Sequence, residues 1–119
     1  MKNVVAIIRP ERLESVEHAL AKVLDEGDHY RLTVDMVEGH GRQDAEVEVF
    51  RGQLVRLRRI PKTRINICVN DAYVEKTIAA IIEGARSDGS GQVGDGKIFV
   101  LPLEDCVRIR TGERGPNAI

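Results

Sequence analysis

A glycine-rich stretch that ends in a lysine is the first feature of this sequence that could bind a ligand. Residues Gly94–Lys97 read Gly-Asp-Gly-Lys and follow Gly89 and Gly91. Glycine allows backbone N–H groups to come close to a phosphate group, and a following lysine adds a positive charge. The spacing matches neither the Walker loop nor the dinucleotide pattern GxGxxG, so on its own the stretch favours a plain flexible turn.

The second candidate is a pair of arginines, Arg108 and Arg110, separated by Ile109. In a β-strand this alternation puts both guanidinium groups on one face and Ile109 in the core. Two neighbouring like charges repel each other unless an anion lies between them, so the pair suits a phosphate group. A surface strand that carries solvated charges is the alternative.

A long segment without a clear pattern, residues 39–62, is the third candidate. A loop of this length is rarely accidental in a small domain, and one with glycines at its base can be ordered by a ligand. The alternative is a loop that is merely solvated. The residues at its two ends are Gly39, His40, Gly41, Arg42 and Gln43 on one side and Pro61 and Lys62 on the other.

Histidine and cysteine give no sign of a metal site or of a nucleophilic centre. His18, His29 and His40 share no metal-ligand spacing. Cys68 and Cys106 lie far apart in apolar stretches, which indicates buried thiols rather than a disulfide. No serine or cysteine has a nearby base in a triad-like order, so we expect no catalytic residue.

Composition disfavours several classes of protein. The 119 residues include 18 Lys+Arg and 19 Asp+Glu, for a net charge of −1, and only 3% are aromatic. This balance offers no positive field for DNA and few rings on which single strands could stack. No run of residues reaches the roughly 18 apolar positions of a membrane span, and Arg9-Pro10 interrupts the apolar start before it could be a signal peptide. We expect one cytoplasmic domain that neither binds nucleic acid nor inserts into a membrane.

Hydrophobic patterns predict the elements that must position these candidates. Strands are predicted at 2–8, 32–36, 65–69, 97–101 and 107–110, and helices at 13–24, ended by Gly27, and at 74–85, capped by Asp71. The order β-α-β, long loop, β-α-β indicates an α+β, ferredoxin-like βαββαβ fold with an antiparallel four-stranded sheet and both helices on one face. The other face of the sheet is largely apolar, so we expect it to be buried by association with other copies of the chain.

Together these segments resemble the PII nitrogen-regulatory signal-transduction family, the GlnB/GlnK group, over nearly the whole chain. Each short motif is modest alone, but their order is specific. The motifs are Ala6-Ile7-Ile8-Arg9-Pro10, Gly39-His40-Gly41-Arg42-Gln43, Phe50-Arg51-Gly52, Pro61-Lys62, the stretch from Gly94 to Val100 and the stretch from Arg108 to Arg114. The resemblance implies a single domain over 1–119 with a regulatory loop at about 41–60, a nucleotide loop at about 87–97 and a tail at 111–119.

The resemblance implies a homotrimer that binds ATP or ADP in the clefts between its subunits. The nucleotide-binding residues would be Gly39, Gly41, Arg42, Gln43, Gly94, Asp95, Gly96 and Lys97 of one subunit and Arg108 and Arg110 of its neighbour. The family also senses 2-oxoglutarate, which binds the Mg²⁺ of Mg-ATP; Gln43 would be the protein ligand of that metal and Lys62 would pair with a carboxylate of the effector. ADP lacks the third phosphate and could not support this site.

The long loop is the expected output of such a sensor. Phe50, Arg51 and Gly52 would form its partner-binding part, and Arg51 matches the arginine that enters the mouth of an ammonium channel in relatives resembling GlnK. A solvated turn arginine is the alternative. The implied partner is an ammonium transporter or another nitrogen-assimilation protein, and a transporter would recruit the protein to the membrane.

Four positions depart from the family pattern. Val55 and Gln53 stand where relatives carry a modified tyrosine and a phosphorylated serine, so we expect no covalent modification there. Asp44 and Asn66 stand where Lys and Glu are usual, which removes an ion pair at the base of the loop. The main prediction is a non-enzymatic sensor of ATP, ADP and 2-oxoglutarate, with at most slow ATP hydrolysis. The alternative is a PII-like adenylate sensor without a 2-oxoglutarate response that controls another transporter or enzyme.

Overall fold

A computed structural model describes residues 1–24, 32–40, 48–50, 53–55 and 59–119 of this chain. The strands are β1 (Lys2–Ile8), β2 (Leu32–Gly39), β3 (Glu48–Phe50), β4 (Gln53–Val55), β5 (Ile60–Val69) and β6 (Gly96–Pro102), and the α-helices are α1 (Leu13–Val23) and α2 (Val74–Ala85). Short 3-10 turns lie at Pro10–Arg12, Asp71–Tyr73 and Pro116–Ala118. The predicted helix end at Gly27 falls outside the described residues.

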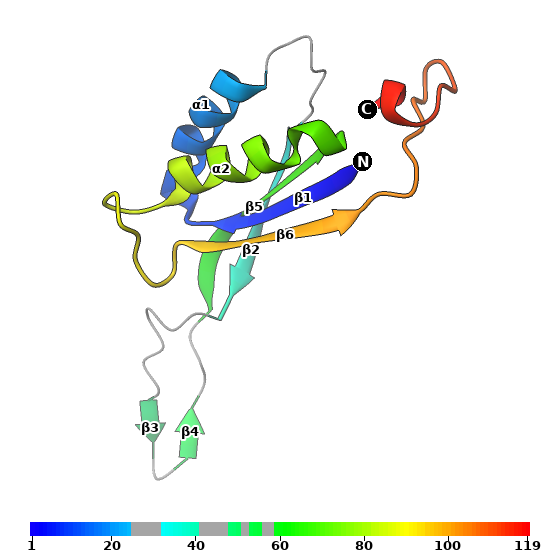
Figure 1. The fold of residues 1–119 in the computed structure, drawn as a ribbon. Coiled ribbons are helices and arrows are strands. Elements are labelled where there is room, and N and C mark those ends of the chain that lie inside the picture. The colour runs from blue at the N-terminus through cyan, green and yellow to red at the C-terminus, as the bar shows by residue number, and fades with distance from the viewer. Residues whose placement is uncertain (25–31, 41–47, 51–52, 56–58) are drawn as a thin grey trace.

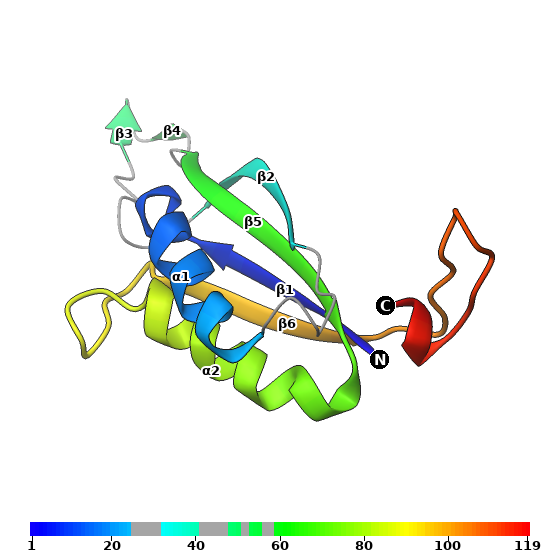
Figure 2. The ribbon, with the colours of Figure 1, turned by 90° about the horizontal axis from the view of Figure 1, so that it is seen from above.

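Four of the strands form one antiparallel sheet in the order β2-β5-β1-β6. Both helices lie on the same face of this sheet (Figures 1 and 2). This arrangement confirms the predicted ferredoxin-like fold. Strands β3 and β4 form a separate two-stranded ladder in which Phe50 is opposite Gln53.

The core lies between the sheet and the two helices because the central strands alternate in burial. Val4, Ala6 and Ile8 of β1 are buried, and so are the β5 residues that pair with them, Ile65 among them. They pack in one cluster with buried residues of α1 and α2 such as Leu20. Burial of this apolar surface is the main stabilising contribution to the fold.

The opposite face of the sheet has no covering element among the described residues. Val5 and Ile7 on β1 are half-buried, while Phe99 and Leu101 on β6 are 50% and 46% exposed. The pairing register puts Val5 beside Phe99 on this face. An apolar surface of this kind favours association with another copy or another protein.

Helices α1 and α2 are in close contact at Gly84. A Cβ atom added there would lie 2.5 Å from Val16 Cα and 2.8 Å from the Ser15 carbonyl oxygen. Alanine is normally better than glycine in a helix by about 1 kcal/mol. Here we expect Gly84→Ala to lower the free energy of unfolding by roughly 2 kcal/mol, because the helices must move apart.

Urea unfolding followed by circular dichroism measures this effect. Ala79→Gly, at an exposed position of the same helix, is the control and should cost about 1 kcal/mol through helix propensity alone. A Gly84→Ala variant as stable as the wild type would contradict the close contact between the helices.

The start of the second helix differs from the prediction. Asp71 does not cap it: α2 begins at Val74, and neither it nor the preceding 3-10 turn has a side-chain cap. Instead, Asp71 Oδ1 accepts a hydrogen bond from the Met1 ammonium group at 2.8 Å, which lowers the pKa of Asp71. The pairing of β1 with β5 brings the chain terminus to this carboxylate, so a partner distant in sequence replaces the local one.

Strands β2 and β5 are longer than predicted. They pair up to Gly39 and Ile60, so β5 begins before Pro61 and includes Lys62. Each strand extends because the other supplies hydrogen-bonding partners, which a local pattern cannot reveal. Lys62, predicted at the end of a loop, is therefore held on a strand of the sheet.

Both cysteines are free, as predicted, but Cys68 and Cys106 are half-buried rather than fully buried. Burial raises the pKa of the Cys68 thiol, with a further contribution from Cys106. A raised pKa disfavours the reactive thiolate of Cys68.

Candidate functional site

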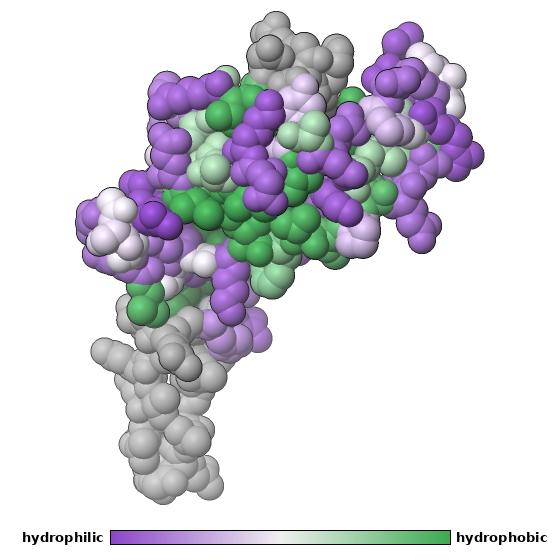
Figure 3. Space-filling model, viewed as in Figure 1, coloured by the Kyte–Doolittle hydropathy of each residue, from purple (hydrophilic) through white to green (hydrophobic). Residues whose placement is uncertain are grey.

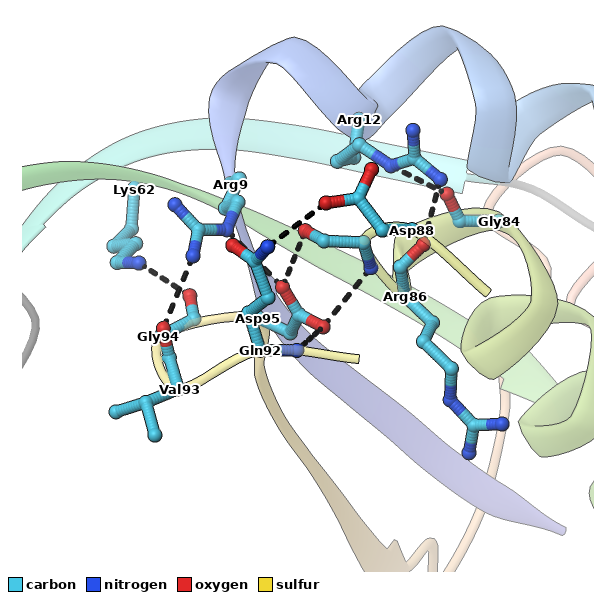
Figure 4. Close-up of polar contacts among 11 residues, drawn as sticks. Arg9, Arg12, Lys62, Gly84, Arg86, Asp88, Gln92, Val93, Gly94 and Asp95 are labelled. Atoms are coloured by element: carbon cyan, nitrogen blue, oxygen red, sulfur yellow. Dashed lines mark hydrogen bonds and ion pairs between the residues drawn. The ribbon is translucent and has the colours of Figure 1, made fainter. Parts of the chain in front are cut away.

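The segment between α2 and β6 is a turn folded around the carboxylate of Asp95 (Figure 4). Asp95 Oδ2 accepts hydrogen bonds from the backbone N–H groups of Ser87 at 3.0 Å and Gln92 at 2.9 Å. Its Oδ1 accepts from Ser87 Oγ at 2.6 Å and from Arg9 Nε at 3.1 Å. The plain flexible turn favoured by the glycine spacing is therefore wrong, because these hydrogen bonds fix the segment. We call residues 87–95 the Asp95 turn.

The electrostatics of the turn keep Asp95 ionised. Partial burial raises its pKa, but hydrogen bonds from Ser87, Gln92 and Arg9 lower it by more, so the pKa of Asp95 lies below its usual range. A lowered pKa in the folded state stabilises the protein above the ordinary aspartate value of about 3.9. That contribution declines as the pH falls below about 3.9 and is gone once the pH is below the folded-state value.

Two cations from the sheet hold carbonyl groups of the Asp95 turn. Arg9, just after β1, donates from Nη2 to the Val93 carbonyl at 3.0 Å. Lys62, on β5, donates from Nζ to the Gly94 carbonyl at 2.7 Å and is 8% exposed. A Cβ atom added at Gly39 would lie 3.8 Å from Lys62 Cγ. The structure thus brings together Gly39, Lys62 and Gly94, which the sequence suggested from three separate motifs.

Glycines give the turn its shape. Gly91 and Gly94 have φ values of 87° and 96°, in the region that favours glycine. Gly96, predicted as a loop residue, is the first residue of β6, and Lys97, the first residue of the predicted strand, follows it; both are exposed. A turn with such φ values can direct successive N–H groups toward one anion, as phosphate-binding nests do.

A pocket of about 330 Å³ lies beside the turn, between α2 and the start of β6. Isoleucines of α2, β1 and β6 line most of it, and Arg86, Asp95 and Lys97 add charge at one end. Figure 3 shows hydrophobic residues gathered across the middle of this side of the molecule, with hydrophilic residues around them. An apolar surface next to a glycine-rich turn that is flanked by Arg86 and Lys97 has the chemistry that a base and its phosphates need.

The arginine pair does not lie on a strand of the sheet. Val107 makes only an isolated bridge, and the chain then turns, with the Arg108 N–H donating to the Glu113 carbonyl at 2.8 Å. Ile109 is 101% exposed, so its predicted contact with the core is wrong. Arg108 Nη1 lies 2.9 Å from a Glu113 carboxylate oxygen. The described chain offers this segment no neighbouring strand, so a local turn and an ion pair replace the predicted strand that also carried Arg110.

The segment with the arginines lies at the other end of β6 from the Asp95 turn (Figure 1). It is attached near the N-terminus, where the Leu103 N–H donates to the Met1 carbonyl at 3.1 Å. Asn70 Nδ2 donates to the Pro116 carbonyl at 3.1 Å. Within one chain, Arg108 is therefore not brought to the residues of the Asp95 turn.

Several predicted site residues fall outside the described residues. These are Gly41, Arg42, Gln43, Asp44, Arg51 and Gly52. The backbone of Phe50 belongs to β3. The predicted roles of these residues in nucleotide, magnesium and partner binding stay predictions.

Three residues that organise the turn were missed as site residues. Arg9 marked the end of a strand and belonged to a family motif, with no predicted role in the site, while Ser87 and Gln92 were loop positions with no role. Arg9 is 86 residues from Asp95 in sequence, so no local pattern links them. The sequence does place Arg9 directly after a strand predicted to be buried. A half-buried guanidinium group needs a partner, so Arg9 could have been predicted to pair with an acidic residue.

The described part of the chain contains no group of three or more His, Cys, Asp and Glu residues that could hold a metal ion. No helix among the described residues is long and apolar enough to cross a membrane.

Comparison with known proteins shows the family of this chain. The profile of the family described as Nitrogen regulatory protein P-II matches residues 1–113. Nitrogen regulatory protein GlnK1 of Methanosarcina mazei is 48% identical over 119 residues, covering 100% of this chain and 97% of that protein. Nitrogen regulatory protein P-II of Azospirillum brasilense is 43% identical, with 100% of both chains covered.

A solved structure supports the same assignment. The crystal structure of Arabidopsis thaliana PII bound to citrate superposes with a TM-score of 0.76 at 39% identity, covering 99% of this chain and 91% of that one. With the ferredoxin-like sheet, the family match over most of the chain and relatives named as regulatory proteins, the chain belongs to the P-II family of nitrogen regulatory, signal-transduction proteins.

Proposed function

We propose that this protein is a non-enzymatic, homotrimeric sensor that binds ATP and ADP in competition in the clefts between subunits and senses 2-oxoglutarate through Mg-ATP. It acts from the cytoplasm on a partner through the 41–60 loop. The partner is an ammonium transporter or another nitrogen-assimilation protein, and a transporter would draw the sensor to the membrane. ATP hydrolysis is at most slow.

The observation that carries this proposal is the contact between Lys62 and the Asp95 turn. Lys62 is the residue proposed for an effector carboxylate, and its Nζ lies 2.7 Å from the carbonyl of Gly94 in the proposed nucleotide turn. An effector held by Lys62 would lie next to phosphates held by the turn. This proximity lets one ligand change the affinity of the other, which is what joint sensing requires.

Magnesium fits this proposal through oxygen ligands. Gln43 offers an amide oxygen, and the nucleotide phosphates and the effector offer the others; oxygen ligands are those that Mg²⁺ prefers. When bound, the ion would neutralise charge between the phosphates and the effector. Lys62 would neutralise an effector carboxylate from the protein side.

The separation of the arginines from the turn supports a site between subunits. Strand β6 has seven residues, and at about 3.3 Å per residue it spans about 20 Å. Arg108 and Arg110 lie past one end and Gly94 past the other. Arginines from a neighbouring subunit would meet the phosphates in the cleft, and the exposed face of the sheet offers a surface on which such subunits could assemble.

Phe99→Asp tests this assembly. Phe99 is 50% exposed in the single chain, so a charge there should leave the fold intact while disfavouring burial between subunits. We expect the wild type to have the mass of a trimer by light scattering and the variant to shift mostly to monomer at micromolar concentration. Ala79→Asp, which adds the same charge at an exposed position of α2, should remain a trimer. Trimeric Phe99→Asp would contradict assembly through this face.

One observation favours effector binding and one favours the alternative adenylate sensor. The Arabidopsis relative was solved with citrate bound, and a polycarboxylate ligand in that protein supports a carboxylate site here. Against this, Asn66 and Asp44 stand where a Glu and a Lys are usual. Asn66 lies opposite Thr33 within β5 rather than at the base of the loop, where it was expected.

Calorimetric titration of 2-oxoglutarate decides between the two functions. Saturable heat with Mg-ATP present and none with ADP is the expected result. Heat from ATP and ADP themselves but none from 2-oxoglutarate in either run would replace the proposal with the adenylate sensor. No heat from any adenine nucleotide would contradict both.

A further inference from the structure

We propose that Asp95 is the positioning residue of the nucleotide-binding turn: it fixes the turn in its binding conformation before nucleotide arrives. This inference rests on the proposed function and deepens it. It also changes the role expected for Asp95, which the family resemblance suggested as a direct nucleotide contact.

The carboxylate has no free acceptor position for a ligand. Oδ1 accepts from Ser87 Oγ and Arg9 Nε, and Oδ2 accepts from the N–H groups of Ser87 and Gln92. An ionised carboxylate offers about four lone-pair positions, and these contacts occupy them. A further negative charge facing phosphates would also weaken binding. Asp95 therefore contributes by holding the protein rather than by touching the nucleotide.

The hydrogen bonds of Asp95 join three separate parts of the fold. Ser87 follows the end of α2, Gln92 lies in the turn itself, and Arg9 follows β1 (Figure 4). Arg9 also donates to the Val93 carbonyl at 3.0 Å, so one guanidinium group ties the turn to the sheet at two places. The Arg9 and Asp95 side chains are each 18% exposed, so solvent competes only weakly for these bonds.

A turn that is already ordered binds more tightly than one that must be ordered by its ligand, because ordering opposes binding. The Asp95 contacts order the turn before nucleotide binds, so the binding free energy is not reduced by the cost of ordering it. Removing the carboxylate should weaken binding without removing any atom that touches the ligand.

Asp95→Asn tests the inference with two measurements on the full-length protein. Asparagine keeps the shape, but its NH₂ group cannot accept a hydrogen bond from Ser87, Gln92 or Arg9. In the free protein we expect amide hydrogen exchange of residues 87–95 to accelerate by about tenfold or more, with exchange in β1 and α2 unchanged. By calorimetry, the Kd for Mg-ATP should rise by about tenfold or more.

Asp88→Asn is the matched control in the same turn. Asp88 accepts a hydrogen bond from Gln92 Nε2 at 2.8 Å and has a φ of 49°, which asparagine tolerates. Asp88→Asn removes the same charge from the same turn without touching the four contacts of Asp95, so exchange of residues 87–95 should change by less than about threefold. Any change in its Kd measures the effect of the charge alone, and the rise in Kd for Asp95→Asn should exceed it.

A second pair of variants tests the hydroxyl contact. Ser87→Ala removes the Oγ donor that lies 2.6 Å from Asp95 Oδ1, whereas Ser87→Thr keeps a hydroxyl at that position. We expect faster exchange of the turn and a higher Kd in the alanine variant, and recovery of both in the threonine variant. Loss of global stability alone would not give this recovery.

The outcomes separate the possible roles. Weaker nucleotide binding by Asp95→Asn with unchanged exchange in the free protein would mean that Asp95 is a direct ligand, which overturns the inference. The inference is also overturned if neither the exchange of the turn nor the Kd changes in Asp95→Asn. Exchange does not depend on nucleotide, so a wild type that binds no ATP would contradict the proposed function, while faster exchange of the Asp95→Asn turn would still support the ordering role.

Discussion

Gly96→Ala is expected to lower the free energy of unfolding by roughly 3 kcal/mol or more. A Cβ atom added at Gly96 would lie 1.7 Å from the carbonyl oxygen of Ile7, and the φ of Gly96 is 115°. The neighbouring atoms belong to the backbone of β1, a central strand, and cannot rotate away. Alanine must therefore break the pairing of β6 with β1 at the point where the Asp95 turn joins the sheet.

Urea unfolding of Gly96→Ala against Gly89→Ala measures this effect. Gly89 has a φ of 74°, but no atom lies within 4 Å of its added Cβ. Gly89→Ala should lower the free energy of unfolding by only about 1 kcal/mol, from backbone strain alone. Equal losses of unfolding free energy in the two variants would mean that the clash with Ile7 adds nothing to the strain of an alanine at positive φ.

Lys62→Met is expected to weaken 2-oxoglutarate binding by about tenfold to a hundredfold, the effect of losing a hydrogen bond between charged groups. Methionine keeps the length and the apolar stem of a side chain that is 8% exposed, but lacks the ammonium group. Mg-ATP affinity should change by less than about tenfold, because the contact of Lys62 Nζ with the turn is to the backbone carbonyl of Gly94, which does not face a phosphate as a donor. Titration of each ligand by calorimetry separates the two effects.

Lys22→Met is the control for this variant. Lys22 lies on α1 with its side chain 58% exposed and its Nζ 3.9 Å from Glu83. Lys22→Met therefore makes the same substitution at a surface position. Both affinities should equal those of the wild type. An equal loss of ATP and 2-oxoglutarate binding in Lys62→Met would contradict a separate effector role and favour a purely structural one.

Some parts of the fold could be predicted because they depend on local chemistry. The alternation of apolar residues along β1, with Val4 and Ile8 buried, is a property of the strand period, and so is the helical spacing that places Ile81 in the core. Glycine at 94 and 96 likewise marks a place where the backbone must turn in a way other residues resist. The order of such elements was enough to indicate the ferredoxin-like sheet.

Other parts depend on which strands become neighbours. Lys62 was predicted at the end of a loop, but the pairing of β2 with β5 begins at Gly39 and Ile60, so Lys62 lies within β5. Arg108 was predicted on a strand, but the described chain provides no strand beside it, and an ion pair with Glu113 forms instead. In both cases the local pattern was compatible with either state, and the presence or absence of a pairing partner decided.

The sequence by itself determined the two helices, the approximate positions and order of the four sheet strands and the family motifs, since these depend on residues close together in the chain. Only the tertiary structure decided how the motifs combine. Arg9 meets Asp95, and Lys62 meets Gly94, across 86 and 32 positions of sequence. Such contacts depend on strand register, and register depends on hydrogen bonds and core packing over the whole sheet. No short stretch of sequence contains that information.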